Sequence, residues 1–234
     1  MSATIIQQEL LSHANPKRAK SSLWFFKTGK GQYGEGDKFI GIGSATMRAI
    51  AKRYKDVDPE VVQELLHSPI HEYRQTAVLI LVYKYPKADK QTQRKMFELY
   101  MKNFKYINNW DLVDISAPHV VGKYLLENPN RRKILYTFAK SKNLWKKRIA
   151  IISTFMFIRD NDFDDSLRIA KILLHDAHGL IHKAVGWMLR EIGNRNQAVE
   201  EAFLKKYYKT MPRTMLRYAI EKFDPQKRAW YLKK

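Results

Sequence analysis

Apolar residues recur along the chain at the three- and four-residue spacing of helices that turn one face toward a core. One such stripe contains Val61, Leu65 and Leu66, and another contains Val185, Met188, Leu189 and Ile192. The alternation that is typical of strands is nearly absent. Prolines lie between these stretches or at their starts, where a missing N–H group costs little: Pro16, Pro59, Pro69, Pro86, Pro129, Pro212 and Pro225. The pattern predicts an all-α protein.

The helical stretches repeat at a regular distance. Segments 73–76, 111–114, 145–148 and 180–183 each carry polar or charged residues directly before a short apolar run, and their ends are 38, 34 and 35 residues apart. This period is the size of a helix pair in repeat proteins, and the residue pattern of a TPR array is missing. We therefore predict a HEAT-like solenoid forming a single domain over 1–234, with an irregular helical bundle as the alternative. In a solenoid, one helix of each pair lines a concave wall. The four segments are therefore expected to line a basic groove.

Charge indicates the class of partner. The chain has 43 Lys and Arg against 23 Asp and Glu, which gives a net charge of +20. The electric field of so positive a protein attracts polyanions, of which nucleic acid is the commonest and an anionic membrane surface the second. The alternative is that the charge only keeps the protein in solution. Five Trp and 13 Tyr scattered among the basic residues favour nucleic acid.

Composition excludes several kinds of site. Because the chain has no cysteine, disulfides, thiolate metal sites and a cysteine nucleophile are excluded, and a reducing interior is favoured. The first twenty residues lack the pattern of a signal peptide, and no apolar stretch approaches 18 residues. We expect a cytoplasmic protein without a membrane anchor.

Six of the ten glycines lie in the glycine-rich segment, residues 27–43. Gly29, Gly31 and Gly34 satisfy G-x-G-x-x-G, but no strand is predicted before them, so a dinucleotide site is rejected. Lys27, Lys30 and Lys38, together with backbone N–H groups, could follow phosphates along this segment. An ordinary connector between two helices is the equal alternative.

Two clusters are candidates for chemistry. His175, His178 and His182 have helical spacing, but no cysteine or glutamate completes a zinc signature, so neither a metal nor a cofactor is expected. Trp110 and Asp114 are four residues apart and share a helical face. Between them, Asp111 is expected to cap the helix start beside Asn109. Asp114 is either a catalytic carboxylate or a structural ion-pair partner of Arg148.

Several stretches resemble the DNA alkylation repair family of AlkD-like DNA glycosylases. The resemblance covers nearly the whole chain and is carried by residues 25–29, 109–114, 144–150, 180–191 and 211–213. It is most specific in the last two thirds. It implies a HEAT-like solenoid that binds duplex DNA in its concave face as a monomer. It also implies a monofunctional glycosylase that releases cationic N3- and N7-alkylpurines, such as 3-methyladenine and 7-methylguanine, without flipping the base.

The resemblance assigns roles to individual residues. The catalytic carboxylate falls on Asp114, the two tryptophans that contact the sugar fall on Trp110 and Trp187, and the groove arginine falls on Arg148. Phe25 stands where the family has a tyrosine near the lesion. Gly43 and Ser44 stand where the family usually has a glutamine–threonine pair. The DNA contacts made at these positions are therefore expected to differ from those of the family. The further expected DNA contacts are Lys147, Lys183, Arg190, Lys27, Lys30, Ser44 and Arg48.

The implied chemistry is consistent with a single carboxylate. An alkylated purine already carries positive charge, so its departure needs no general acid, whereas ordinary glycosidases use two carboxyl groups. Asp114 would stabilise the oxocarbenium-like sugar and position the attacking water. The alternative is a non-catalytic HEAT-like protein that binds branched or distorted DNA. A protein-binding scaffold is disfavoured by the charge of +20.

Overall fold

The computed structural model describes residues 2–233, and within them the regular structure is helical. The one β pairing in this range is an isolated parallel bridge between Lys38 and Ile70. The all-α prediction and the helical-repeat class are confirmed. No helix among the described residues has the length and apolar character needed to cross a bilayer. The chain divides into two compact units between Tyr124 and Leu125, and the single domain over 1–234 stays a prediction.

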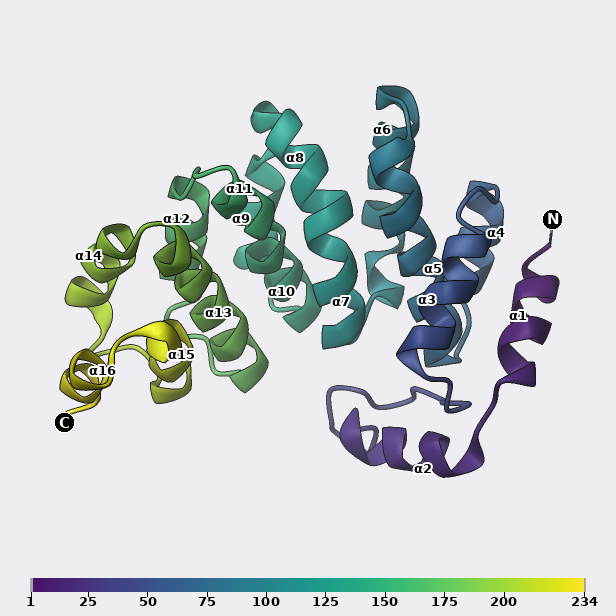
Figure 1. The fold of residues 1–234 in the computed structure, drawn as a ribbon, viewed down its shortest axis with the longest axis horizontal. Helices are drawn as coiled ribbons and strands as arrows, with labels where there is room; N and C mark the ends of the chain where they lie inside the picture. Colours follow the sequence, from purple (N-terminus) through teal and green to yellow (C-terminus); the bar gives the residue numbers. More distant parts are fainter. Residues whose placement is uncertain (1, 234) are drawn as a thin grey trace. The chain divides into compact units, whose positions relative to one another are not determined.

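The first unit begins with two helices that are followed by the glycine-rich segment, and then continues as a series of helices (Figure 1). Its elements are α1 (Ala3–Ser12), α2 (Pro16–Phe25), α3 (Ser44–Arg53), α4 (Pro59–Leu66), α5 (His71–Lys84), η1 (Tyr85–Lys87), α6 (Lys90–Asn103), η2 (Phe104–Tyr106), α7 (Trp110–Ser116) and the π-helix η3 (Ala117–Gly122).

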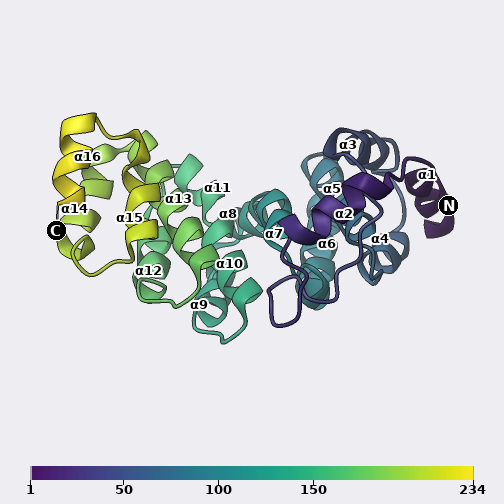
Figure 2. The ribbon, with the colours of Figure 1, turned by 90° about the horizontal axis from the view of Figure 1, so that it is seen from below.

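Helix α5 is the centre of this unit because α3, α4 and α7 all pack against it. Its residues 77–81 are buried on every side, which explains why its sequence is apolar beyond a single stripe. Helix α2 lies across the ends of α3 and α5, and Figure 2 shows it overlapping them when seen along the perpendicular direction.

The second unit is built around α13. Its elements are α8 (Lys123–Glu127), whose first two residues still belong to the first unit, η4 (Pro129–Arg131), α9 (Lys133–Ala139), α10 (Leu144–Ser153), α11 (Phe155–Arg159), α12 (Asp164–Ile172), α13 (Gly179–Arg195), α14 (Gln197–Tyr207), α15 (Arg213–Ala219), η5 (Ile220–Lys222) and α16 (Pro225–Leu232). Helix α13 packs against α10, α12, α14 and α15. A Cβ atom at Gly186 would lie 2.5 Å from the main-chain oxygen of Met215, so this glycine permits the close approach of α13 and α15.

The predicted repeat is found at the helix starts. The four segments fall in the opening turns of α5, α7, α10 and α13. The prediction that these segments line a groove is wrong for segment 73–76. All four of its residues, Tyr73, Arg74, Gln75 and Thr76, are buried. The reason is the packing of three helices on α5, which leaves its first turns no open groove to line.

Candidate active site

The first turn of α7 carries Trp110 and is closed by an amide cap. The side-chain oxygen of Asn109 accepts a hydrogen bond from the Trp110 amide at 2.8 Å. The expectation that Asp111 caps this helix is therefore wrong. Asp111 lies inside the helix, is 6% exposed, and binds His71 with one carboxylate oxygen.

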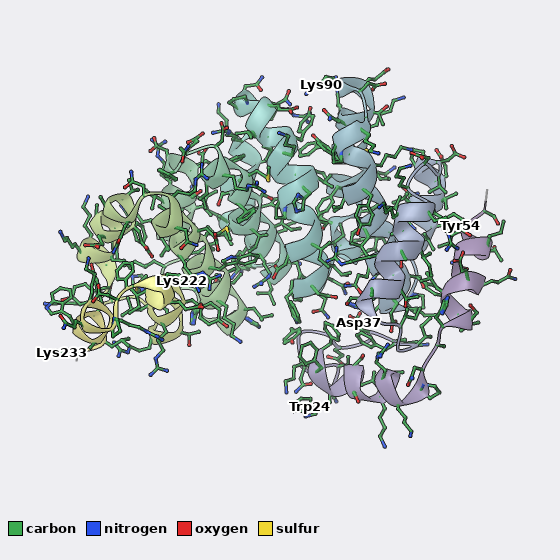
Figure 3. All side chains as sticks on the ribbon, in the orientation of Figure 1. Trp24, Asp37, Tyr54, Lys90, Lys222 and Lys233 are labelled. Carbon is green, nitrogen blue, oxygen red and sulfur yellow. The ribbon has the colours of Figure 1, made fainter. Side chains whose placement is uncertain are left out.

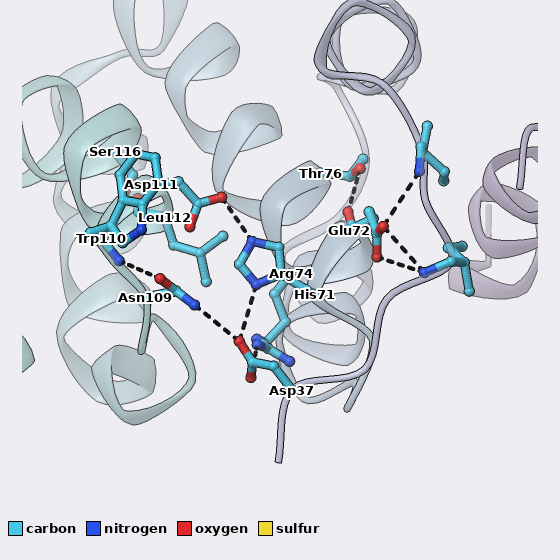
Figure 4. A network of polar contacts seen from close by, with 12 residues as sticks. Asp37, His71, Glu72, Arg74, Thr76, Asn109, Trp110, Asp111, Leu112 and Ser116 are labelled. Carbon is cyan, nitrogen blue, oxygen red and sulfur yellow. Dashed lines mark hydrogen bonds and ion pairs between the residues drawn. The ribbon is translucent and has the colours of Figure 1, made fainter. Parts of the chain in front are cut away.

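A buried network of charges joins α7, α5 and the glycine-rich segment (Figure 4). The Nε2 atom of His71 lies 2.7 Å from a carboxylate oxygen of Asp111, and its Nδ1 atom lies 3.2 Å from Asp37. Asp37 also accepts hydrogen bonds from Arg74 at 2.6 Å and from Asn109 at 3.2 Å. The cations and carboxylates therefore neutralise each other in an interior where a lone charge would be costly.

Both ring nitrogens of His71 carry protons in this network. Burial by itself would lower the pKa of His71, but the charge of Asp111 and hydrogen bonds to Asp111 and Asp37 outweigh it and raise the pKa to about 9. Burial raises the pKa of Asp37, but the hydrogen bond from His71 and the charge of Arg74 lower it more. At neutral pH the imidazolium thus donates to two carboxylates from two segments of the chain.

The glycine-rich segment is held by a second buried carboxylate. Glu72 accepts hydrogen bonds from the backbone amides of Ile40 at 3.2 Å, Gly41 at 2.7 Å and Ile42 at 3.4 Å. Gly41 has a φ of +82°, and a Cβ atom there would lie 2.1 Å from the main-chain oxygen of Asn15. Because these amides already bind a carboxylate of the protein, this part of the segment is a connector packed on α2 and not a free phosphate cradle.

Aromatic rings from α2 and the glycine-rich segment surround Trp110. The Phe26 ring stacks on Trp110 with centroids 5.6 Å apart, and Phe25 meets the same indole edge-on at 5.9 Å. Phe39 in turn stacks on the His71 ring at 4.7 Å, and Phe26 contacts the same ring at a tilt of 36° with centroids 4.8 Å apart. The predicted residues Phe25 and Trp110 are thus brought together, while Asp114 lies half-buried one turn further along α7.

In the second unit, the predicted residues come from α10 and α13. Arg148 is 4% exposed, and its guanidinium donates to the main-chain oxygen of Leu180. Trp187 is half-buried, and its indole N–H donates to Glu191 at 2.9 Å. Lys183 is exposed. The packing therefore gives Arg148 a structural contact that the sequence did not predict.

Several of the other predicted DNA-contacting cations already have partners within the protein. Lys147 forms an ion pair with Asp176, and Arg190 forms one with Glu221. The ammonium of Lys27 lies 4.5 Å above the ring of Trp24. The predicted DNA-contacting residues that are exposed are Phe25, Lys30, Ser44, Arg48 and Lys183.

The three histidines do not share a helix. Helix α12 ends at Ile172, so His175 lies in the turn that follows this helix. His178 caps α13 by accepting a hydrogen bond from the Leu180 amide at 3.1 Å. Within residues 2–233 no group of three or more histidines and carboxylates has the arrangement of a metal site.

Comparison with known proteins identifies the family. Residues 6–223 match the sequence model of the family described as DNA alkylation repair enzyme. The chain belongs to that family. Its resemblance to the family, inferred above from short motifs, is therefore confirmed, and with it an association with DNA repair.

Solved structures confirm the fold of this DNA alkylation repair family member. A predicted DNA alkylation repair enzyme from Enterococcus faecalis superposes with a TM-score of 0.70 at 17% identity, covering 91% of this chain and 98% of the other. The crystal structure of smu.31 from Streptococcus mutans UA159 superposes with a TM-score of 0.56 at 18% identity, covering 77% and 92%. No curated protein matches the sequence.

Sequence reasoning missed the buried network around His71. Asp37, His71 and Arg74 come from the glycine-rich segment and from the start of α5, and 34 residues separate Asp37 from His71. The available signal was a group of ionisable residues directly before the apolar run of α5, next to Pro69. Such a group at the start of a fully buried helix requires partners, because a buried charge without one is costly.

Proposed function

We propose that this protein is a monofunctional DNA glycosylase that hydrolyses the N-glycosidic bond of cationic N3- and N7-alkylated purines in duplex DNA. The observation that carries the proposal is the placement of Trp110 and Asp114 one turn apart on α7. The first turn of this helix is fixed by the Asn109 cap and by the ion pair between Asp111 and His71. A rigid support of this kind is what a catalytic carboxylate requires.

In the proposed reaction the C1′–N bond of the lesion breaks and its electron pair leaves with the purine. The alkylated purine departs as a neutral base, because the electron pair cancels its positive charge. Asp114 stabilises the positive sugar and orients a water molecule. The oxygen of this water bonds to C1′ as one of its protons passes to the Asp114 carboxylate. The indole of Trp110 lies against the deoxyribose and adds cation–π attraction.

Phosphate contacts would set the position of the duplex. Exposed cations serve this role best, because they have no partner to give up on binding. Lys30, Arg48 and Lys183 are exposed, whereas Lys147 and Arg190 must exchange carboxylate partners for phosphates. We assign Arg148 chiefly to holding α10 against the start of α13, through its bond to Leu180.

The proposal is tested by single-turnover release of 7-methylguanine from a duplex oligonucleotide. Wild type should release the base, and Asp114→Asn should lose release while binding DNA at least as tightly, because a negative charge is removed. Asp58→Asn makes the same charge change at an exposed position of the first unit and should keep full activity. Release by Asp114→Asn at the wild-type rate would refute the role of Asp114. If wild type binds the duplex tightly but releases no base, the alternative of a non-catalytic DNA-binding protein would be favoured.

A further inference from the structure

A groove of about 330 Å³ lies between α12 and α14, entirely within the second unit. Both helices pack on α13, and each residue that lines the groove comes from α12 or α14. None of the residues that we propose to contact DNA is among the described residues that line it. The groove is therefore built from other residues than the proposed DNA contacts.

The deepest part of the groove is apolar. Phe203 is 7% exposed, and the centroid of its ring lies 4.7 Å from that of Tyr207. Leu167 lies half-buried on the opposite helix, α12. Filling such a recess with an apolar side chain removes apolar surface from water, and apolar patches bordered by polar residues are typical of sites for protein partners.

Three cations border the apolar residues. Arg168 and Lys171 come from α12 and Lys206 comes from α14, and all three side chains are exposed. No carboxylate lines the groove in the part of the chain that the structure describes. Within residues 2–233 neither lysine ammonium has an ion-pair partner, and Arg168 has the exposed Asp164 at 3.6 Å. Because exposed ion pairs contribute little, these charges are available to a partner that carries carboxylates.

Positive charge by itself does not single out the groove. Exposed lysines occur elsewhere in the second unit, and Lys222 and Lys233, labelled in Figure 3, are two of them. The groove differs from these positions because its cations stand on both sides of an apolar recess. Phosphates of DNA would pair with the cations and leave the recess unfilled. A bilayer surface takes up apolar side chains that protrude, whereas Phe203 is recessed.

A peptide with apolar side chains between carboxylates complements both features. We infer that the groove binds an acidic peptide segment of a partner protein, with an apolar side chain of the peptide against Phe203 and its carboxylates at Lys171 and Lys206. Complementary charge directs the encounter and the orientation, and the buried apolar side chain gives most of the affinity. The inference goes beyond the proposed function and does not depend on it, since it requires neither DNA nor excision.

The test follows the fluorescence anisotropy of a labelled peptide, built from repeats of Asp-Asp-Phe and Asp-Asp-Leu, as the protein is added. Two control peptides carry Asn in place of every Asp, or Ser in place of every Phe and Leu. Lys171→Glu and Lys206→Glu reverse a charge beside the groove, and Ala202→Trp places an indole in it. Lys205→Glu is the matched control, because Lys205 is the exposed neighbour of Lys206 on α14 and does not line the groove. All four substituted positions are exposed, so folding should be unaffected.

We expect wild type and Lys205→Glu to bind the acidic peptide nearly equally, and each groove variant to bind it at least about fivefold more weakly. The Asn and Ser peptides should show similar losses with wild type. Labelled duplex DNA and vesicles of anionic phospholipid are titrated in parallel, and their binding should not distinguish the groove variants from Lys205→Glu. The inference is overturned if wild type does not bind the acidic peptide, if the groove variants bind it as Lys205→Glu does, or if only DNA or vesicles depend on the groove. Base excision is assayed separately, so failure of the proposed function would leave this result unchanged.

Discussion

Replacing His71 by glutamine tests whether the buried network holds the first unit together. The substitution leaves Asp111 without its cation, and it leaves Asp37 with the Arg74 guanidinium and the Asn109 amide. Removing one partner of a buried ion pair typically costs about 3–5 kcal/mol. We therefore expect His71→Gln to lower the free energy of unfolding by several kcal/mol at neutral pH.

The pH dependence of that loss identifies its cause. The pKa of His71 is raised from 6.5 to about 9, which corresponds to about 3 kcal/mol of stability that depends on its proton. Because the folded-state pKa lies above the unfolded value, this stability is fully present below pH 6.5 and is lost as the pH rises through about 9. The charged groups that face His71 are Asp37, Asp111 and Arg74.

The assay is urea unfolding followed by circular dichroism at pH 6 and pH 10, for wild type and His71→Gln. The difference in unfolding free energy between the two proteins should shrink by about 3 kcal/mol from the lower to the higher pH. His13→Gln makes the same change at an exposed histidine of the same unit and should show no such trend. An equal difference at both pH values would refute the assignment of a charged His71.

Three further predictions concern the second unit. Burial and the charge of Glu201 raise the pKa of Glu200 to about 9, so wild type should lose stability as the pH rises from 4.5 to 9. Glu200→Gln should remove this loss and raise the melting temperature at pH 8. A melting temperature below that of wild type would contradict the prediction. Gly186→Ala should cost about 1–3 kcal/mol in urea unfolding because of the contact with α15, whereas Gly179→Ala, where a Cβ meets nothing within 4 Å, should not. Lys183→Ala should reduce the slope of log binding constant against log salt by about one unit, and an unchanged slope would exclude a phosphate contact.

The fold could be predicted from local patterns, because helix pairs are a local consequence of apolar spacing. The period of the polar segments located the starts of α5, α7, α10 and α13 correctly. The spacing of Trp110 and Asp114 placed them on one helix for the same reason. These features depend on neighbours in the sequence, so one chain was enough to find them.

Burial of segment 73–76 and the partners of its charges could not be predicted in this way. They depend on which helices pack on α5, and Arg74 meets Asp37 across 37 residues of sequence. The glycine-rich segment was open to two interpretations because glycine permits both a phosphate loop and a tight connector. For residues 40–42 the contact that makes them a connector comes from Glu72, which lies 31 residues away from Gly41.

The sequence itself indicates where α7 ends, because a proline, Pro118, follows soon after Asp114. Pro118 has no N–H to donate to the main-chain carbonyl of Asp114, four residues earlier, and the helix passes into π-helical turns over η3. The α-helical segment with Trp110 and Asp114 is therefore limited by Asn109 at its start and by a proline just after its end. Because its first turn is also tied to His71, the orientation of the proposed catalytic side chains is set by buried contacts in the first unit. On the proposed function, surface cations would set how tightly DNA is bound, while the buried charges set where the carboxylate stands.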